Sequence, residues 1–343
     1  MRPPAFWHAP PGLRAALLSP LGALYAAGTR RRLARGARAR VGVPVICVGN
    51  LNAGGTGKTP TVVALAGRLA ERGIAAHAVT RGHGGSLEGP VRVDERAHGA
   101  AQTGDEALLL AAFMPTWVAG DRAAGARAAV AAGAQAIVLD DGFQNGALAH
   151  DLSLIVVDAH IGFGNGRVIP AGPLREPVVA GMARADLLLS IGDAAGQATF
   201  AARWGDRVSV PRLEGALVPL ATGLPLTGLP VLAFAGIGHP EKFFRTLKHL
   251  GAELKSTHAL GDHQPLTDAL MARMLREAKA IGAQVVTTEK DAVRLPPGLR
   301  AQVMTVPVRL GLDDWGPLDA ALDRVFDGAG AGMTERRPTA APG

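Results

Sequence analysis

The sequence has a single cysteine, Cys47, among 343 residues. An intrachain disulfide and a zinc site built from cysteines are therefore excluded, and the composition fits a reducing compartment. Aromatic residues are also scarce, at 4%, whereas hydrophobic residues make up 48% of the chain. We expect a core of aliphatic side chains that includes Cys47, in two domains or in one large α/β domain with an appendage.

Acidic residues are absent from the first 40 positions, which hold eight arginines and no lysine. This segment carries +8 and the whole chain carries +7, so the remaining residues sum to −1. Because the basic charge is confined to one end, the body of the protein is predicted not to bind nucleic acid.

Long apolar runs are missing as well. Residues 13–28 are apolar but fall short of the ~20 residues of a membrane span, and no clear cleavage site follows them. Their leucines recur at helical spacing, at Leu13, Leu17, Leu21 and Leu24. An apolar helical face beside an arginine cluster fits the surface of an anionic membrane, so 1–40 is predicted to contact the membrane. The alternative is a solvated basic helix packed on its own domain.

The chain does contain a glycine-rich turn between a strand and a helix. Residues 43–48 are mostly β-branched and predict a buried strand, and 61–70 predict a helix. Between them lie a Gly-Gly-Thr-Gly turn and then Lys58 and Thr59, which is the layout of a P-loop. In such a loop the backbone amides and the helix N-terminus bind phosphates, the lysine reaches the β- and γ-phosphates, and the threonine holds Mg²⁺.

The predicted ATP-binding residues are Asn52, Ala53, Gly54, Gly55, Thr56, Gly57, Lys58 and Thr59. Asn52 stands where the P-loop consensus has glycine, and asparagine tolerates a left-handed backbone better than most residues. The alternative is a glycine-rich turn that binds no ligand.

A second acidic motif follows the predicted strand 136–139, which ends in Asp140 and Asp141. An apolar strand that ends in acid, downstream of a P-loop, has the form of a Walker B element, whose carboxylate binds Mg²⁺ directly or through water. With Thr59, these two residues are the predicted metal ligands. Adjacent side chains point in different directions, so one of the two is expected to face the metal.

Two shorter motifs have two interpretations each, and a third matches no known metal site. Asp105 precedes a leucine-rich helix and is either a helix cap or a functional acid. Arg175 and Glu176, in a proline-rich loop, are either a phosphate clamp or a surface ion pair. Asp262 and His263 lie in a loop with His258, at a spacing that matches no reliable zinc pattern.

Alternating strands and helices predict a three-layer, P-loop NTPase-like α/β fold with a mostly parallel sheet, a smaller C-terminal α/β lobe and an N-terminal amphipathic helix. The site is expected at the carboxyl ends of the strands. The predicted divisions are a membrane-contact segment over 1–40, a P-loop kinase core over 41–205, a second lobe over 206–327 and a disordered tail over 328–343.

The remaining motifs narrow the class of P-loop protein. A GTPase would carry Asn-Lys-x-Asp, whereas Lys290 and Asp291 are adjacent. A partitioning ATPase of the deviant Walker class would have lysine where Ala53 stands. These features leave a kinase of a small or lipid-like acceptor.

The ordered set of motifs resembles the tetraacyldisaccharide 4′-kinase family, the lipid A 4′-kinases of Gram-negative bacteria. The matching strings cover most of the chain: Val48-Gly-Asn-Leu-Asn-Ala-Gly-Gly-Thr-Gly-Lys-Thr-Pro60, Arg81-Gly-His-Gly-Gly, Gly104-Asp-Glu, Asp140-Asp-Gly-Phe-Gln, Pro170-Ala-Gly-Pro-Leu-Arg-Glu, Phe234-Ala-Gly-Ile-Gly, Asp262-His and Thr287-Thr-Glu-Lys-Asp-Ala-Val. The chain departs from the family at Asn145, where histidine is usual, and at His83, where tyrosine or a similar residue is frequent.

The resemblance implies transfer of the γ-phosphate of ATP to the 4′-hydroxyl of tetraacyldisaccharide 1-phosphate, which forms lipid IV-A, by a peripheral protein on the cytoplasmic face of the inner membrane. ATP and Mg²⁺ are the implied cofactors, the glycolipid and the membrane surface the partners, and a monomer is expected. The family's aspartate in Gly-Asp-Glu makes Asp105 the proton acceptor and His263 its dyad partner. Arg175 would stabilise the transferring phosphoryl, and Glu176 would orient it or join the metal network. The alternatives are a kinase of another glycolipid and a non-catalytic nucleotide-gated switch at the membrane.

Overall fold

The structure is a computed structural model that describes residues 4–35, 38–223, 225–262 and 264–334. Its centre is a nine-stranded sheet in the order β13-β8-β7-β6-β1-β5-β2-β4-β3. Only β3 and β13 run antiparallel to their neighbours, so the predicted α/β fold with a mostly parallel sheet is confirmed. The strands span Val45–Gly49 (β1), Ala76–Thr80 (β2), Val91–Arg92 (β3), Thr116–Val118 (β4), Ala136–Asp140 (β5), Leu152–Asp158 (β6), Leu187–Ile191 (β7), Arg212–Pro219 (β8) and Val308–Leu312 (β13).

Helices cover both faces of this sheet, and its central strands β7, β6, β1, β5 and β2 are therefore buried on both sides. One apolar cluster joins the sheet to α5 (Arg122–Ala131), α6 (Val178–Met182) and α7 (Ala194–Trp204). The other joins it to α2 (Lys58–Glu71), α4 (Asp105–Ala111) and α12 (Gly316–Thr334). Cys47 is fully buried in the first cluster, as predicted. The short elements are η1 (Ala5–Trp7), α3 (Ala100–Thr103) and η2 (Gly205–Arg207).

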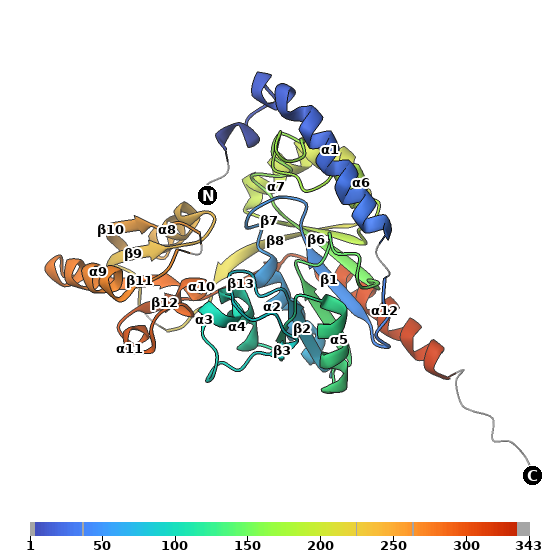
Figure 1. The fold of residues 1–343 in the computed structure, drawn as a ribbon. Helices are drawn as coiled ribbons and strands as arrows, with labels where there is room; N and C mark the ends of the chain where they lie inside the picture. Colours follow the sequence, from blue (N-terminus) through green and yellow to red (C-terminus); the bar gives the residue numbers. More distant parts are fainter. Residues whose placement is uncertain (1–3, 36–37, 224, 263, 335–343) are drawn as a thin grey trace, which may run out of the picture.

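A second, smaller lobe is built on the four-stranded parallel sheet β10-β9-β11-β12. Its elements are β9 (Pro230–Ala235), α8 (Pro240–His249), β10 (Glu253–Ala259), α9 (Asp268–Ala280), β11 (Gln284–Thr288), α10 (Glu289–Ala292), α11 (Pro297–Arg300) and β12 (Met304–Val306). One apolar cluster packs α8 on this sheet and a separate one packs α9, so the lobe has its own core. Figure 1 shows it beside the large sheet, with α10 next to α3 and α4.

The small sheet takes its strands from residues 230–306, a shorter stretch than the lobe predicted over 206–327. The strand before this stretch, β8, pairs with β7, and the strand after it, β13, pairs with β8. The chain thus leaves the large sheet, builds the lobe and returns to the same sheet edge.

The last helix, α12, also belongs to the large sheet. Arg68 of α2 donates to Asp319 at 2.5 and 3.1 Å, and Arg72 donates to Asp323 at 2.6 Å. The helix runs to Thr334, so the tail that was predicted to be disordered from 328 is helical in its first part, and 335–343 lies outside the described residues.

The N-terminal helix α1 (Leu13–Arg35) lies along the outside of the large lobe, near α6 (Figure 1). It runs through Pro20 without a break. A Cβ at Gly22 would lie 2.8 Å from the Val168 carbonyl oxygen, so this face of α1 packs closely on the body. None of the helices in the described residues combines the length and apolarity that a bilayer crossing requires.

Candidate active site

The glycine-rich loop joins the carboxyl end of β1 to the N-terminus of α2, which begins at Lys58. Gly57 precedes the helix with a φ of +95°, a conformation that favours glycine, and a Cβ there would lie 2.6 Å from the Ile191 side chain. A Cβ at Gly54 or Gly55 would meet no atom within 4 Å. The loop is therefore packed at its helical end and open at its tip, where phosphates bind in a P-loop.

Two asparagines hold the loop in place. Asn50 is fully buried, and its Nδ2 donates to the Gly54 carbonyl at 3.1 Å and to the Thr56 hydroxyl at 3.2 Å. Asn52 donates from Nδ2 to the Gly162 carbonyl at 2.9 Å. Asn52 does not adopt the left-handed backbone that asparagine tolerates, because Asp141 is the one non-glycine residue with a positive φ in the described part of the chain. The Asn52 side chain therefore anchors the loop from behind.

Asp140 ends β5 next to the P-loop strand and is only 1% exposed. Neither of its carboxylate oxygens has a hydrogen-bond partner in the described residues. Burial, with a further contribution from the negative charge of Glu106, raises the pKa of Asp140 to about 7. A buried carboxylate without a hydrogen-bond partner is costly, and the charges of Lys58 and Arg122 act against the rise in its pKa without cancelling it. Both oxygens of Asp140 are therefore available to a bound cation.

Asp141 has a different environment. Its φ of +56° turns the side chain toward the P-loop, and its Oδ1 lies 3.7 Å from Lys58 Nζ and 2.8 Å from Arg175 Nη1. Burial opposes ionisation, but the charges of Lys58 and Arg175 outweigh it and lower the pKa of Asp141. Left-handed backbone at a non-glycine residue costs energy and is concentrated at functional sites, which fits this position.

The proline-rich loop lies against the same group of residues. Arg175 bonds Asp141 and also donates from Nη1 to Gln144 Oε1 at 3.3 Å. Glu176 is buried, and it accepts from Gln144 Nε2 at 3.0 Å and from Arg184 at 2.6 Å. Arg175 therefore faces the site, whereas Glu176 acts on it through Gln144.

Asp105 begins α4 and is 3% exposed. Its Oδ1 accepts from the Glu106 amide at 2.9 Å, and its Oδ2 lies 3.7 Å from Arg294 Nε of the small lobe. Lys290, also from the small lobe, donates to Glu106 at 3.1 Å. Burial acts to lower the pKa of Lys290, but the carboxylates of Glu106, Asp105 and Asp262 together raise it. The acid at the start of α4 thus lies at the contact between the lobes.

The small lobe also reaches the P-loop. A Cβ at Gly238 would lie 3.7 Å from the Gly55 amide nitrogen, and Lys242 of α8 forms an ion pair with Asp158 at the end of β6. On the opposite side, Arg309 of β13 donates to Glu289 at 2.6 Å. The small lobe therefore contacts the site at the carboxyl ends of the large sheet, as expected for an open α/β fold.

Two residues of the family motifs, His263 and Asn145, lie outside the contacts described above. His263 lies outside the described residues, so its pairing with Asp105 stays a prediction. Asn145 accepts from the Ala147 amide at 2.8 Å, so this asparagine stabilises a local turn where the family usually has histidine. The residues that sequence analysis did not assign to the site are Asn50, Gln144, Arg184, Lys290 and Arg294. Asn50 directly follows the P-loop strand, whereas the other four reach the site through contacts with residues distant in the sequence.

The described residues contain no group of three His, Cys, Asp or Glu side chains that would hold a metal ion alone. The residues still suit Mg²⁺ bound together with nucleotide phosphates, because Asp140 offers two unpaired buried oxygens and Thr59 lies at the start of α2. Mg²⁺ takes oxygen ligands and is usually held by one or two carboxylates plus phosphate and water.

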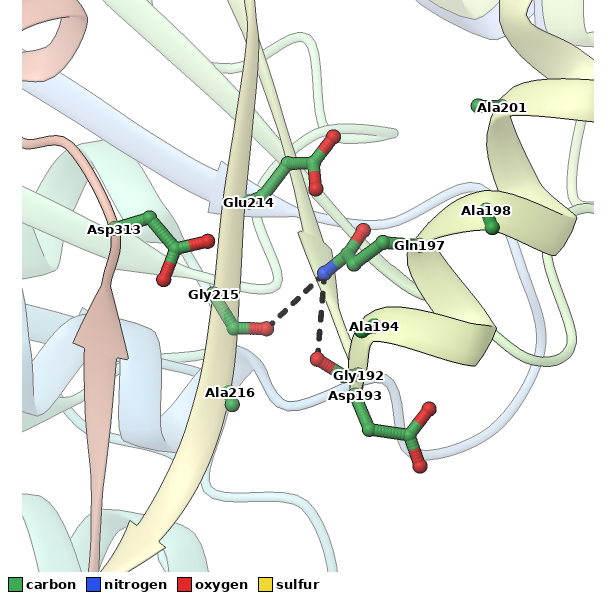
Figure 2. Close-up of a pocket in the computed structure, with 10 residues that line it drawn as sticks. All are labelled: Gly192, Asp193, Ala194, Gln197, Ala198, Ala201, Glu214, Gly215, Ala216 and Asp313. Atoms are coloured by element: carbon green, nitrogen blue, oxygen red, sulfur yellow. Dashed lines mark hydrogen bonds between the residues drawn. The ribbon is translucent and has the colours of Figure 1, made fainter.

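A cavity of about 470 Å³ lies two strands from β1 in the sheet, where Gly192 follows β7 (Figure 2). Gln197 bridges the carbonyls of Gly192 and Gly215 at 3.4 and 3.2 Å. The charged groups in the lining are carboxylates, from Asp193, Glu214 and Asp313. Their negative charge makes this cavity unsuitable for phosphate, so the phosphate site stays with the P-loop.

Comparisons with known proteins agree with this geometry. The model of the LpxK family, tetraacyldisaccharide-1-P 4′-kinase, matches residues 14–327. The tetraacyldisaccharide 4′-kinase of Jannaschia sp. is 70% identical over 95% of this chain and 99% of its own length, and that of Dinoroseobacter shibae is 68% identical over 96% and 99%. The fold is similar to that of the "apo" form of LpxK from Aquifex aeolicus in complex with ATP, with a TM-score of 0.71, 26% identity and coverage of 92% of this chain and 100% of that one.

Proposed function

The chain belongs to the tetraacyldisaccharide-1-P 4′-kinase family, and from this premise we propose how its residues carry out the reaction. It is an ATP-dependent kinase that phosphorylates the 4′-hydroxyl of tetraacyldisaccharide 1-phosphate in lipid A biosynthesis. The observation that carries the residue assignment is the convergence of Lys58, Asp140, Asp141 and Arg175 at the carboxyl end of the large sheet.

ATP binds with its phosphates over the open tip of the P-loop. The N-terminus of α2, which begins at Lys58, carries positive partial charge beside this tip, and the backbone amides of a glycine-rich loop bind phosphates. Lys58 carries its ammonium to the β- and γ-phosphates from beside Asp141. Most of the rate acceleration comes from this positioning and from charge stabilisation, because phosphoryl transfer needs little covalent chemistry from the protein.

Asp140 and Thr59 would hold Mg²⁺, and Asp141 keeps Lys58 and Arg175 in place. This division follows from the unpaired oxygens of Asp140 and from the two cations already bound to Asp141. When bound there, Mg²⁺ would supply positive charge next to the phosphates of ATP. Arg175 uses Nη1 for its side-chain bonds to Asp141 and Gln144, and its other guanidinium nitrogens stabilise the equatorial oxygens of the γ-phosphoryl.

Asp105 accepts the proton of the 4′-hydroxyl. Its Oδ1 accepts from the Glu106 amide, and its Oδ2 lies at the contact with Arg294 of the small lobe. A sugar hydroxyl is a weak nucleophile, and a positioned carboxylate contributes about 10²–10⁴-fold to such a step. His263 orients Asp105 as the second member of the dyad, and Glu176 orients Arg175 through Gln144.

The exposed face of α1 supports contact with the membrane that contains the acceptor. Leu13, Leu17 and Leu24 are 70–77% exposed, whereas Ala15, Gly22 and Thr29 face the body of the protein. The packing of Gly22 on Val168 fixes this orientation, so the leucines point outward. We assign this leucine face, with the arginines of 30–40, to the cytoplasmic surface of the inner membrane.

Replacing Leu13, Leu17 and Leu24 together with serine is expected to lower the partition onto anionic vesicles by at least about 10-fold, since each buried leucine side chain contributes about 1.5–3 kcal/mol. Vesicle sedimentation measures this, with the melting temperature as a check on folding. Ile281→Ser is the matched control, because Ile281 is exposed on the small lobe. Undiminished vesicle binding by the triple variant would place the membrane contact elsewhere.

The reaction itself is tested by transfer of radiolabel from γ-labelled ATP to tetraacyldisaccharide 1-phosphate in detergent, with Mg²⁺ or with EDTA. Label on the lipid that requires Mg²⁺ is the expected result. If ATP binds but this lipid takes no label, the acceptor is another glycolipid or the chain is a nucleotide-gated switch.

A further inference from the structure

Arg294 connects three strand ends of the small lobe. It follows α10, and its side chain is 8% exposed. Nη1 donates to the Gln264 carbonyl at 2.8 Å, and Nη2 donates to the Gly236 carbonyl at 3.3 Å and to the carboxylate of Asp291. Gly236 follows β9, Gln264 lies in the loop after β10, and Asp291 lies in α10 after β11. Arg294 therefore sets how the loops at this end of the small sheet lie relative to one another.

The third donor of the same guanidinium has a different environment. Nε is buried and has no hydrogen-bond partner in the described residues, while Asp105 Oδ2 of the large lobe lies 3.7 Å away. That separation exceeds a hydrogen bond by about 0.5–1 Å. A buried donor that is left unpaired is costly, so the arrangement favours a small approach of Asp105 to Nε.

We propose that Arg294 is a positioning residue for phosphoryl transfer, which holds the Asp105 carboxylate ionised and oriented toward the acceptor hydroxyl from across the lobe contact. The inference rests on the proposed role of Asp105 as proton acceptor. Asp105 is then held at both oxygens, by the Glu106 amide at Oδ1 and by Arg294 at Oδ2. Nη1 and Nη2 fix the guanidinium to the small lobe. The orientation of the Asp105 carboxylate therefore depends on the position of the small lobe.

Lys290 makes a second contact between the lobes, which allows the effect of Arg294 on Asp105 to be separated from an effect on lobe packing. Its Nζ lies 3.1 Å from Glu106 and 3.8 Å from Asp262, and so it joins the lobes beside Asp105. Since Lys290 provides an independent link between the lobes, loss of the Arg294 charge does not by itself separate them. A purely structural Arg294, acting through Asp291 alone, would affect folding of the small lobe without any special coupling to Asp105.

The test is a double-mutant cycle on kcat, with Arg294→Met, Asp105→Asn and the two combined in the full-length protein. Arg294→Met is expected to lower kcat by about 10–100-fold, as is usual for residues that orient a reacting group, with KM for ATP nearly unchanged. In the Asp105→Asn background the same substitution is expected to change kcat less than about twofold, because its target carboxylate is gone. Arg300→Met, an exposed arginine of the same lobe, is the control.

The kinetic results distinguish the role of Arg294 from the proposed role of Asp105 as proton acceptor. If Asp105→Asn leaves kcat unchanged, the proposed base is wrong. If Asp105→Asn lowers kcat but Arg294→Met costs the same factor in both backgrounds, or nothing in either, Arg294 does not act through Asp105. Should Arg294→Met fail to fold by its melting curve, Arg294→Lys takes its place in the same cycle, where equal factors in the two backgrounds again overturn the inference.

Discussion

Asp105→Asn is expected to lower kcat by about 10²–10⁴-fold while the affinity for ATP stays close to that of the unaltered protein. Asparagine keeps the size of the side chain and can still accept from the Glu106 amide, but it cannot take up the proton of the 4′-hydroxyl. The P-loop does not depend on Asp105, because it is held by Asn50, Asn52 and the packing of Gly57.

Steady-state kinetics with labelled ATP, together with a direct ATP-binding measurement, checks this expectation. Asp193→Asn is the matched control, since Asp193 also lies at the start of a helix and asparagine is an equally good N-cap. The control is expected to retain activity within about twofold, because a surface change of this kind is small. An Asp105→Asn enzyme with full kcat would remove this residue from proton transfer.

Asp140→Asn is expected to reduce kcat by about 10²–10³-fold and to raise the Mg²⁺ concentration needed for half-maximal activity. The reason is the environment of the carboxylate, which is buried, has no hydrogen-bond partner in the described residues and adjoins the P-loop strand. An amide in its place is uncharged and presents a single oxygen, so it would hold a hard cation weakly.

Asp141→Asn provides the comparison, because it makes the same chemical change one residue away. Asp141 bonds Arg175 and lies near Lys58, so its loss is expected to impair phosphoryl transfer with little change in the Mg²⁺ requirement. Titration of Mg²⁺ against initial rate, at saturating ATP, separates the two variants. If the Mg²⁺ requirement shifts for Asp141→Asn and not for Asp140→Asn, the metal ligand is Asp141.

The P-loop and the Asp140-Asp141 pair could be located from sequence because their chemistry is local. A strand, a glycine turn and a helix N-terminus follow one another within 45–71, and the acids end the neighbouring strand β5. The different environments of the two acids could not be predicted, since they depend on the positive φ of Asp141 and on Arg175, 34 positions away. Arg294 could not be identified from the sequence, because only the packing of the two lobes brings it close to Asp105.

The linear order of residues was thus sufficient for the fold class, the nucleotide loop, the basic N-terminal segment and the family, because apolar periodicity and turn residues act over a few positions. Folding in three dimensions determined the rest. It placed β8, β13 and α12 with the large sheet, turned Glu176 inward and set the leucines of α1 outward. These features depend on strand pairing and on ion pairs such as Arg68–Asp319, which join residues 251 positions apart and have no local signature.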